Sequence, residues 1–307
     1  MSTPTVPPTI TQAVEVRPAS LDIASQPIRG PRALDDSWSR FWQLAYNIAR
    51  SEFKLKFFGS ALGYIWQVMR PLLLFGVLYV FFVVIFKVNR AHGAAGKFYG
   101  VQLLGSIVLF TFFNESTAGA VRSVVDRETL VRKIQFPRLA IPISVVLLAA
   151  FNLGLNLVVV MIFAVASGVD PMFSWFELPL IILMVVLLST GIAMLLSALF
   201  VRFRDIQPIW DVFSQILFYS SPVIIPVETV RRELLHHQFL YHVYTLNPLV
   251  TVFQQFRHAM VNHATLSAGQ ALGSWTALLE PLALVAIIFV LGFWVFNREA
   301  PHIAEDL

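Results

Sequence analysis

Six long apolar stretches constrain the fold of this chain more than any other feature of its sequence. They cover roughly residues 61–86, 98–120, 139–167, 178–201, 210–225 and 275–296. A bilayer core about 30 Å thick is crossed by a helix of about 20 apolar residues. The sequence therefore predicts an all-α polytopic membrane protein with six transmembrane helices, of which the fifth is the shortest.

Composition supports the same class. The 307 residues are 57% hydrophobic and 13% charged, with a mean hydropathy of +0.72, whereas soluble domains carry about 25% charged residues. Cysteine is absent, which excludes disulfides, thiolate metal sites and thiol chemistry.

The segments outside the predicted spans divide the chain further. Residues 1–33 are rich in Pro, Thr and Ser without a helical period, which is typical of a disordered tail. They lack the basic start, apolar core and cleavage site of a signal peptide. An interface helix over 34–60, a transmembrane domain over 61–298 and a short tail over 299–307 complete the expected organisation.

Residues 34–60 have the pattern of an amphipathic helix in the membrane interface. Trp38, Phe41 and Trp42 recur at spacings of three and four, and Lys54 and Lys56 follow. Tryptophan and basic residues anchor such helices at lipid headgroups. The alternative, a soluble helix packed on its own domain, is weaker because no other cytoplasmic segment is long enough to provide one.

Basic residues orient the chain. With a cytoplasmic N-terminus, thirteen Lys and Arg residues beyond the tail fall inside and six fall outside. The positive-inside rule then predicts a multi-pass protein with both termini in the cytoplasm.

Arg70 and Glu115 are ionisable residues within the first and second predicted spans. Arg70 stands near the inner end of the first span, where it can snorkel to the interface, so we interpret it as an anchor. Glu115 lies deeper, and an intramembrane carboxylate must face protein, water or a partner. It is equally a candidate for the transport path and for bracing one helix against another.

Polar residues recur on one face of the fifth stretch. They include Asp211, Gln215 and Tyr219, and such a stripe favours a wet pathway or an oligomer seam over a lipid-facing surface. Asn152 and Asn156 in the third span are typical of close helix packing.

The segment from about 226 to 274 is too polar to span a membrane and too apolar to be free in water. Its first part, from residue 227 to residue 261, reads as two short helices broken at Asn247-Pro248, because a residue before proline avoids the helical region. We expect helices that lie on the outer surface or re-enter the membrane. Most histidines lie in outer segments without metal-ligand spacing, so no metal site is predicted.

No enzyme motif is present. The sequence lacks GxSxG, DxD and the GxxxxGK[ST] phosphate loop, so we expect a chain that neither catalyses a reaction nor captures ATP by a loop of its own.

Several motifs, in order, resemble one known family. They are FKLKFFGSALGYIWQVMRPLL at 53–73, FFNESTAGAVRSVVDRETLVRKIQFPRLAIPI at 112–143, YSSPVIIP at 219–226, LNPLVTVFQQFRHAM at 246–260 and NREAPHIAEDL at 297–307. Over residues 38–307 the chain resembles permease subunits of ABC polysaccharide exporters, which move lipid-linked O-antigen, teichoic acid or cell-wall glycans such as galactan. It departs from them in a longer tail, in Arg70 where Asn is common, and in Phe110 where Trp is frequent.

The resemblance implies a homodimer of permeases in the plasma (inner) membrane, in contact with membrane lipids. It also implies two copies of a separate ATPase subunit that binds ATP and Mg. It implies no cofactor in this chain and no nucleic-acid partner. The lipid-linked polysaccharide would thread between the permeases, and the helix before residue 61 would act as a lateral gate.

The resemblance also assigns residues. A coupling helix over 126–136 would dock on the ATPase through Asp126, Glu128, Leu130, Arg132, Lys133 and Phe136; Pro137 would end it and Arg138 would anchor at headgroups. Arg202, Arg204 and Asp205 would make a second contact. The channel would be lined by Tyr64, Trp66, Tyr79, Glu115, Asp211, Phe213, Gln215, Phe218 and Tyr219, and Asn247, Pro248 and Arg257 belong to the outer segment.

Two alternatives remain open at this level. One is a permease of the same superfamily that exports a drug or a small lipid. The other is a polytopic membrane enzyme such as a glycan or lipid transferase, against which the short cytoplasmic loops and the missing acid–base motifs argue.

Overall fold

A computed structural model describes residues 38–57, 61–87, 96, 98–133, 136–234, 236–261 and 265–301. For residues 57, 61–64, 130, 132 and 133 it describes the backbone alone. All of these residues belong to the unit Pro31–Leu307. The predicted N-terminal tail and residues 302–307 lie outside the described residues.

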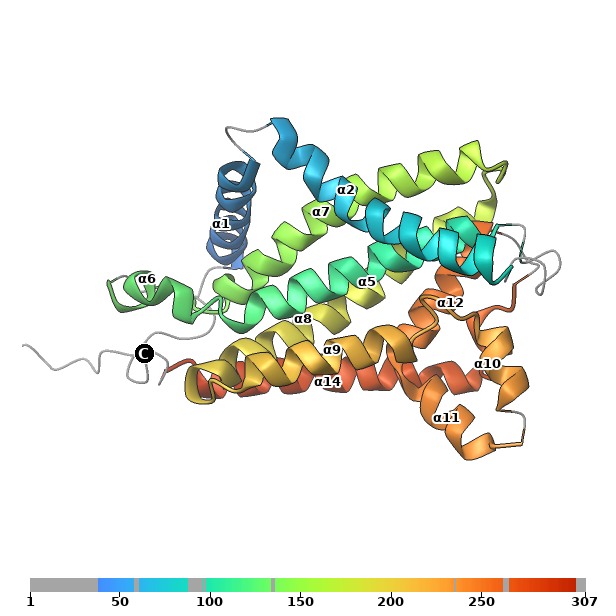
Figure 1. Ribbon diagram of the computed structural model, residues 1–307. Coiled ribbons are helices and arrows are strands. Elements are labelled where there is room, and N and C mark those ends of the chain that lie inside the picture. Colours follow the sequence, from blue (N-terminus) through green and yellow to red (C-terminus); the bar gives the residue numbers. More distant parts are fainter. Residues whose placement is uncertain are drawn as a thin grey trace, which may run out of the picture. The chain divides into compact units, whose positions relative to one another are not determined.

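Every secondary-structure element in the described ranges is helical, as the sequence predicts. The long helices run side by side, with α1 across one end of them and α10, α11 and α12 at the other end (Figure 1). The helices are α1 (Trp38–Phe57), α2 (Ala61–Tyr79) with its π-helical continuation η1 (Val80–Ile85), α5 (Tyr99–Val121), α6 (Glu128–Lys133), α7 (Ala140–Ala166), α8 (Leu178–Arg202), α9 (Ile206–Ser220), α10 (Val227–Glu233), α11 (Gln238–Leu246), α12 (Pro248–Val261), α13 (Ala268–Ala271) and α14 (Leu279–Glu299). Short 3-10 turns are η2 (Val125–Arg127), η3 (Phe173–Glu177) and η4 (Thr276–Leu278).

Five helices of the described chain are long and apolar enough to cross a membrane. They are α2 with η1, α5, α7, α8 with η3, and α14 with η4, at the first, second, third, fourth and sixth predicted spans. The 15 residues of α9 rise only about 22 Å at about 1.5 Å per residue. The fifth predicted span, over 210–225, therefore remains a prediction.

The core is built around α5. This helix contacts α7, α8, α2, α12 and α9, and most of its residues are buried. A glycine in its first half lets α12 approach closely, because a Cβ on Gly105 would lie 2.1 Å from Cε1 of Phe256. Both faces of α5 are thus occupied by protein rather than lipid.

The amphipathic helix α1 divides its apolar residues between two surfaces. Phe41 and Ala45 are buried in a cluster that includes Val124 and Ala140, and α1 packs mainly on α7. Trp38 and Trp42 are exposed. Helix α1 therefore packs on its own protein, as in the alternative that the sequence disfavoured, and its place in the membrane interface remains a prediction.

The outer segment contains three helices before residue 262 rather than the two predicted, since α10 precedes α11 and α12. The break at Asn247-Pro248 is confirmed: Asn247 is extended and its Oδ1 accepts from Leu249 N at 3.0 Å. Arg257 on α12 is 1% exposed and its Nη2 donates to the Val223 carbonyl at 3.0 Å. This buried guanidinium fixes α12 to the loop after α9.

The predicted coupling helix is wrong in extent. The chain forms η2 and then the short α6, which ends at Lys133, and Phe136 and Pro137 lie outside any helix. The physical reason is that a residue before proline is driven out of the α region. Phe136 packs against the inner cluster around Phe41. The side chains of Leu130, Arg132 and Lys133 lie outside the described residues.

Arg138 is not the headgroup anchor that we expected. It is 3% exposed, and its Nη1 donates to the carbonyl of Ala300. The last carbonyls of a helix have no partner within that helix, and a basic side chain can satisfy them. Arg138 therefore ties the start of α7 to the end of α14.

Candidate functional site

Glu115 joins three helices inside the bundle. Its Oε1 accepts from Gln67 Nε2 of α2 at 2.9 Å, and its Oε2 accepts from Asn152 Nδ2 of α7 at 2.9 Å. Both donors are buried. Both oxygens of the Glu115 side chain are thus held by amide donors, so Glu115 braces α5 against both neighbours.

Glu115 also lines two cavities. This placement bears on the other role that the sequence left open for it, a position on the transport path. An inner cavity of about 590 Å³ lies between α1, α2, α5 and α7. An outer cavity of about 500 Å³ lies between α2, α5 and α9. Arg70, Asn114 and Glu115 line both, so the two cavities meet along α5 and are called here the polar groove.

The inner cavity carries charges of both signs. Its basic residues are Lys56, Arg70 and Arg127, and its acidic residues are Glu52, Glu115 and Asp126. Polar residues in a membrane face the protein interior or a wet cavity, so a charged space of this size suits water and polar ligands.

The outer cavity combines polar and aromatic side chains. Phe110 and Phe218 meet edge to face at 4.9 Å between ring centroids, and Gln215, Ser214 and Tyr219 complete the wall. Tyr219 is 74% exposed, so this end of the groove is open at the molecular surface.

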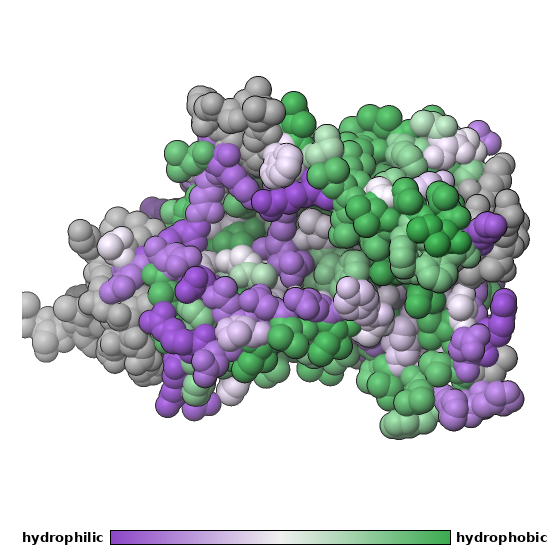
Figure 2. All heavy atoms as spheres, in the orientation of Figure 1, coloured by the Kyte–Doolittle hydropathy of each residue, from purple (hydrophilic) through white to green (hydrophobic). Residues whose placement is uncertain are grey.

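Figure 2 shows the face that carries the groove. Hydrophilic residues gather over the side of α1 and of the first half of α9, and they continue inward between α2 and α9. Hydrophobic residues cover the second half of α2 and its continuation η1. The groove thus begins at the hydrophilic end of the described unit and runs toward its apolar middle.

The structure brings together only part of the predicted channel. Glu115, Gln215, Phe218 and Tyr219 line the groove. Tyr79 instead packs on Phe75 at 5.3 Å. The others, Trp66, Asp211 and Phe213, are exposed but line neither cavity, and the side chain of Tyr64 lies outside the described residues.

Sequence reasoning missed several lining residues. Arg70 was interpreted as an anchor and Asn152 as a packing residue, yet both line the groove, together with Asn114. A signal existed in Asn114, which adjoins Glu115 in the chain. Asn152 could not be found this way, because only tertiary packing brings it to Glu115.

The second predicted contact loop joins the end of α5. Arg202, Arg204 and Asp205 are exposed. The Arg204 guanidinium lies 5.5 Å from the Phe200 ring, and that of Arg122 lies 5.9 Å from the same ring. Cation–π contacts to this buried ring therefore connect the α8–α9 loop with the residue that ends α5.

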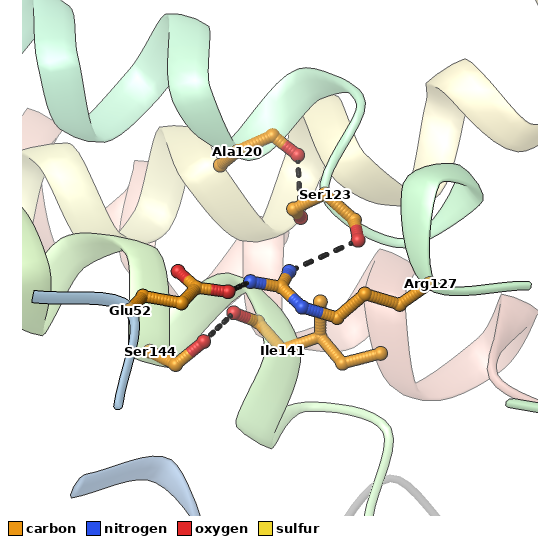
Figure 3. Close-up of polar contacts among 6 residues, drawn as sticks. All are labelled: Glu52, Ala120, Ser123, Arg127, Ile141 and Ser144. Atoms are coloured by element: carbon orange, nitrogen blue, oxygen red, sulfur yellow. Dashed lines mark hydrogen bonds and ion pairs between the residues drawn. The ribbon is translucent and has the colours of Figure 1, made fainter. Parts of the chain in front are cut away.

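An ion pair links α1 to η2 at the inner cavity. Arg127 Nη2 donates to Glu52 Oε1, and Arg127 Nη1 donates to the Ser123 carbonyl at 3.1 Å. Figure 3 shows the Arg127 side chain between Glu52 and Ser123. Burial lowers the pKa of Arg127 from its usual value, but arginine remains charged at physiological pH. Lys56, from the last turn of α1, lines the same cavity.

The helices and the polar groove define a multi-pass membrane protein with a charged, aromatic-lined space beside its central helix. Residues 43–261 match the family model described as ABC-2 type transporter, and the chain belongs to that family. Within the described residues, no group of three or more His, Asp or Glu side chains could hold a metal ion.

Curated relatives match most of the chain. The O-antigen export system permease protein RfbA of Myxococcus xanthus is 25% identical over 268 residues, which cover 86% of this chain and 95% of the relative. Two proteins of the same name from Klebsiella pneumoniae are 25% and 24% identical over 261 residues, covering 85% of this chain and 93% of each relative.

Proposed function

We propose that this chain is the transmembrane subunit of an ATP-driven ABC exporter that moves a lipid-linked polysaccharide, of the O-antigen, teichoic acid or galactan type, across the plasma membrane. Membership of the ABC-2 type transporter family supports the transport role. The name of the relatives, O-antigen export system permease protein, supports the substrate class.

The observation that carries the proposal is the polar groove. Its outer half pairs the aromatic rings of Phe110, Phe218 and Tyr219 with the polar groups of Gln215 and Ser214. Aromatic faces suit the C–H faces of sugars, and amide and hydroxyl groups suit their hydroxyls. A groove that is open at Tyr219 would become a closed channel against a second copy of this chain.

In this scheme the chain itself hydrolyses no ATP. Asp126, Glu128, Arg202, Arg204 and Asp205 at the inner end would contact a separate ATPase subunit, present in two copies, which binds ATP and Mg. Closure of the ATPases would move η2 and α6 as a unit, and rigid-body movement of helices at an interface is a common way to pass on such a change. Both termini would face the cytoplasm, and α1 would admit the lipid carrier at the inner leaflet.

The experiment is purification of the tagged chain from its native membrane in mild detergent, followed by mass spectrometry of the proteins and glycolipids that accompany it. A stoichiometric ATPase and a lipid-linked glycan are the expected result. Purification without a nucleotide-binding partner would overturn the two-component transporter. An ATPase present with normal glycan export in cells that lack this chain would overturn the substrate class in favour of a drug or small lipid.

A further inference from the structure

We propose that Glu52 and Arg127 are positioning residues for transport: their ion pair holds α1 against the inner cavity and transmits movement of η2 and α6 to α1. The holding role follows from the geometry alone. The transmission role rests on the proposed function, because it requires an ATPase that moves α6.

Arg127 makes contacts in two directions at once. One nitrogen of its guanidinium binds the Glu52 carboxylate of α1, and another binds the Ser123 carbonyl just beyond α5 (Figure 3). The side chains of Arg127 and Glu52 are 19% and 31% exposed. An ion pair that is largely shielded from water is screened less by salt than a surface pair, and it leaves a costly unpaired charge when one partner is removed.

The pair attaches the C-terminal half of α1, which also carries the buried Ala49. The first half of α1 is fixed by buried Phe41 and Ala45. Further along, α1 offers edge-to-face ring contacts from Tyr46 and Phe53 to Phe151, at 6.0 and 5.7 Å. Each such ring contact contributes about 0.5–1.5 kcal/mol. The Glu52–Arg127 ion pair adds a link that a local movement of η2 can open.

The pair also forms part of the wall of the inner cavity. Glu52 and Arg127 line it beside Lys56, Arg70 and Asp126. Separation of the pair would release α1 from the cavity and turn an uncompensated guanidinium toward it. Arg127 is the last residue of η2 and α6 begins at the next residue, so displacement of α6 reaches Arg127 without an intervening loop.

The holding role is tested by distance measurement on the purified full-length chain. Because the sequence contains no cysteine, Leu55→Cys on α1 and Val158→Cys on α7 give two spin-label sites in an otherwise unlabelled protein. Both positions are exposed. Glu52→Gln and Arg127→Gln should each broaden the distance distribution between the labels. The exchange Glu52→Arg with Arg127→Glu should restore it, and Arg50→Gln, an exposed cation on the same helix, should leave it unchanged.

The transmission role is tested in the complex with its co-purified ATPase. Each single variant should lower the amount of glycan exported per ATP hydrolysed by roughly fivefold or more, as expected for the loss of an allosteric coupling. The exchange variant should recover the ratio, and a purely structural pair would instead lower hydrolysis and export together.

The outcomes separate the two hypotheses. An unchanged distance distribution in both single variants would overturn the pair as the fastening of α1, whatever the transported substrate. A changed distribution with an unchanged export-to-hydrolysis ratio would overturn the transmission role. Absence of any ATPase would overturn the proposed function, while the distance measurement would still decide the holding role.

Discussion

Gly191 on α8 and Gly292 on α14 mark the point where the backbones of these two helices touch. A Cβ on Gly292 would lie 2.1 Å from the Gly191 carbonyl oxygen, and a Cβ on Gly191 would lie 2.7 Å from the Cα of Phe289. Small residues allow this approach between membrane helices, where close packing replaces the hydrophobic driving force. The crossing fixes the last span against the core.

Gly292→Ala should lower the thermal stability of the detergent-solubilised protein, because the backbone at Gly191 cannot yield as a flexible side chain can. The expected cost is about 1–3 kcal/mol, as for other overpacked sites. The matched control is Gly154→Ala on α7, where nothing lies within 4 Å of the added Cβ. Size-exclusion chromatography after heating measures both variants, and equal midpoints would contradict the crossing.

Phe41 and Trp38 should respond differently to truncation, although both are aromatic residues of α1. Phe41 is 2% exposed and Trp38 is 64% exposed. Phe41→Ala should destabilise the protein by about 3–5 kcal/mol through an unfilled cavity, whereas Trp38→Ala should leave the melting midpoint in detergent nearly unchanged. A larger loss for Trp38→Ala would show that the packed face of α1 is assigned incorrectly.

Glu115 can be probed by separating its charge from its hydrogen bonds. Glu115→Leu should destabilise the protein, since the amides of Gln67 and Asn152 lose their acceptor and each unsatisfied buried group costs about 1–3 kcal/mol. Glu115→Gln keeps one acceptor oxygen, so it should fold, yet we expect glycan export to fall by roughly tenfold, equivalent to about 1.4 kcal/mol. Export measured in cells at equal protein level checks this, and normal export by Glu115→Gln would leave the carboxylate with a bracing role alone.

Charge reversal at the inner end should affect partner binding rather than folding. Arg204→Glu should reduce the amount of ATPase recovered with the tagged chain by roughly fivefold, because charges at the rim of an interface govern association. Arg232→Glu, an exposed change on α10 at the opposite end, should not. Equal ATPase recovery from both variants would exclude the α8–α9 loop from the contact.

Phe136 illustrates how tertiary structure alters a sequence hypothesis. The resemblance makes it a contact for the ATPase, and on that basis Phe136→Asp would uncouple the protein while leaving it in the membrane. Its side chain packs on the inner cluster around Phe41. We now expect Phe136→Asp also to lower the melting midpoint, which makes Arg204→Glu the cleaner test of coupling.

The sequence by itself determined where the five long apolar helices lie. Long apolar runs predict α2, α5, α7, α8 and α14, because a bilayer admits backbone only with its hydrogen bonds satisfied. The break at Asn247-Pro248 followed from the steric effect of proline. These properties are local, so they can be read from neighbouring residues.

Tertiary structure alone decided which polar residues meet. Asn152 joins Glu115 across 37 residues of sequence and Gln67 joins it across 48, and no local pattern encodes such distances. Arg138 likewise finds the end of α14 at Ala300 rather than lipid headgroups. Each of these contacts exists because a polar group inside apolar helices must find its partner wherever packing brings one, and packing is a property of the whole chain.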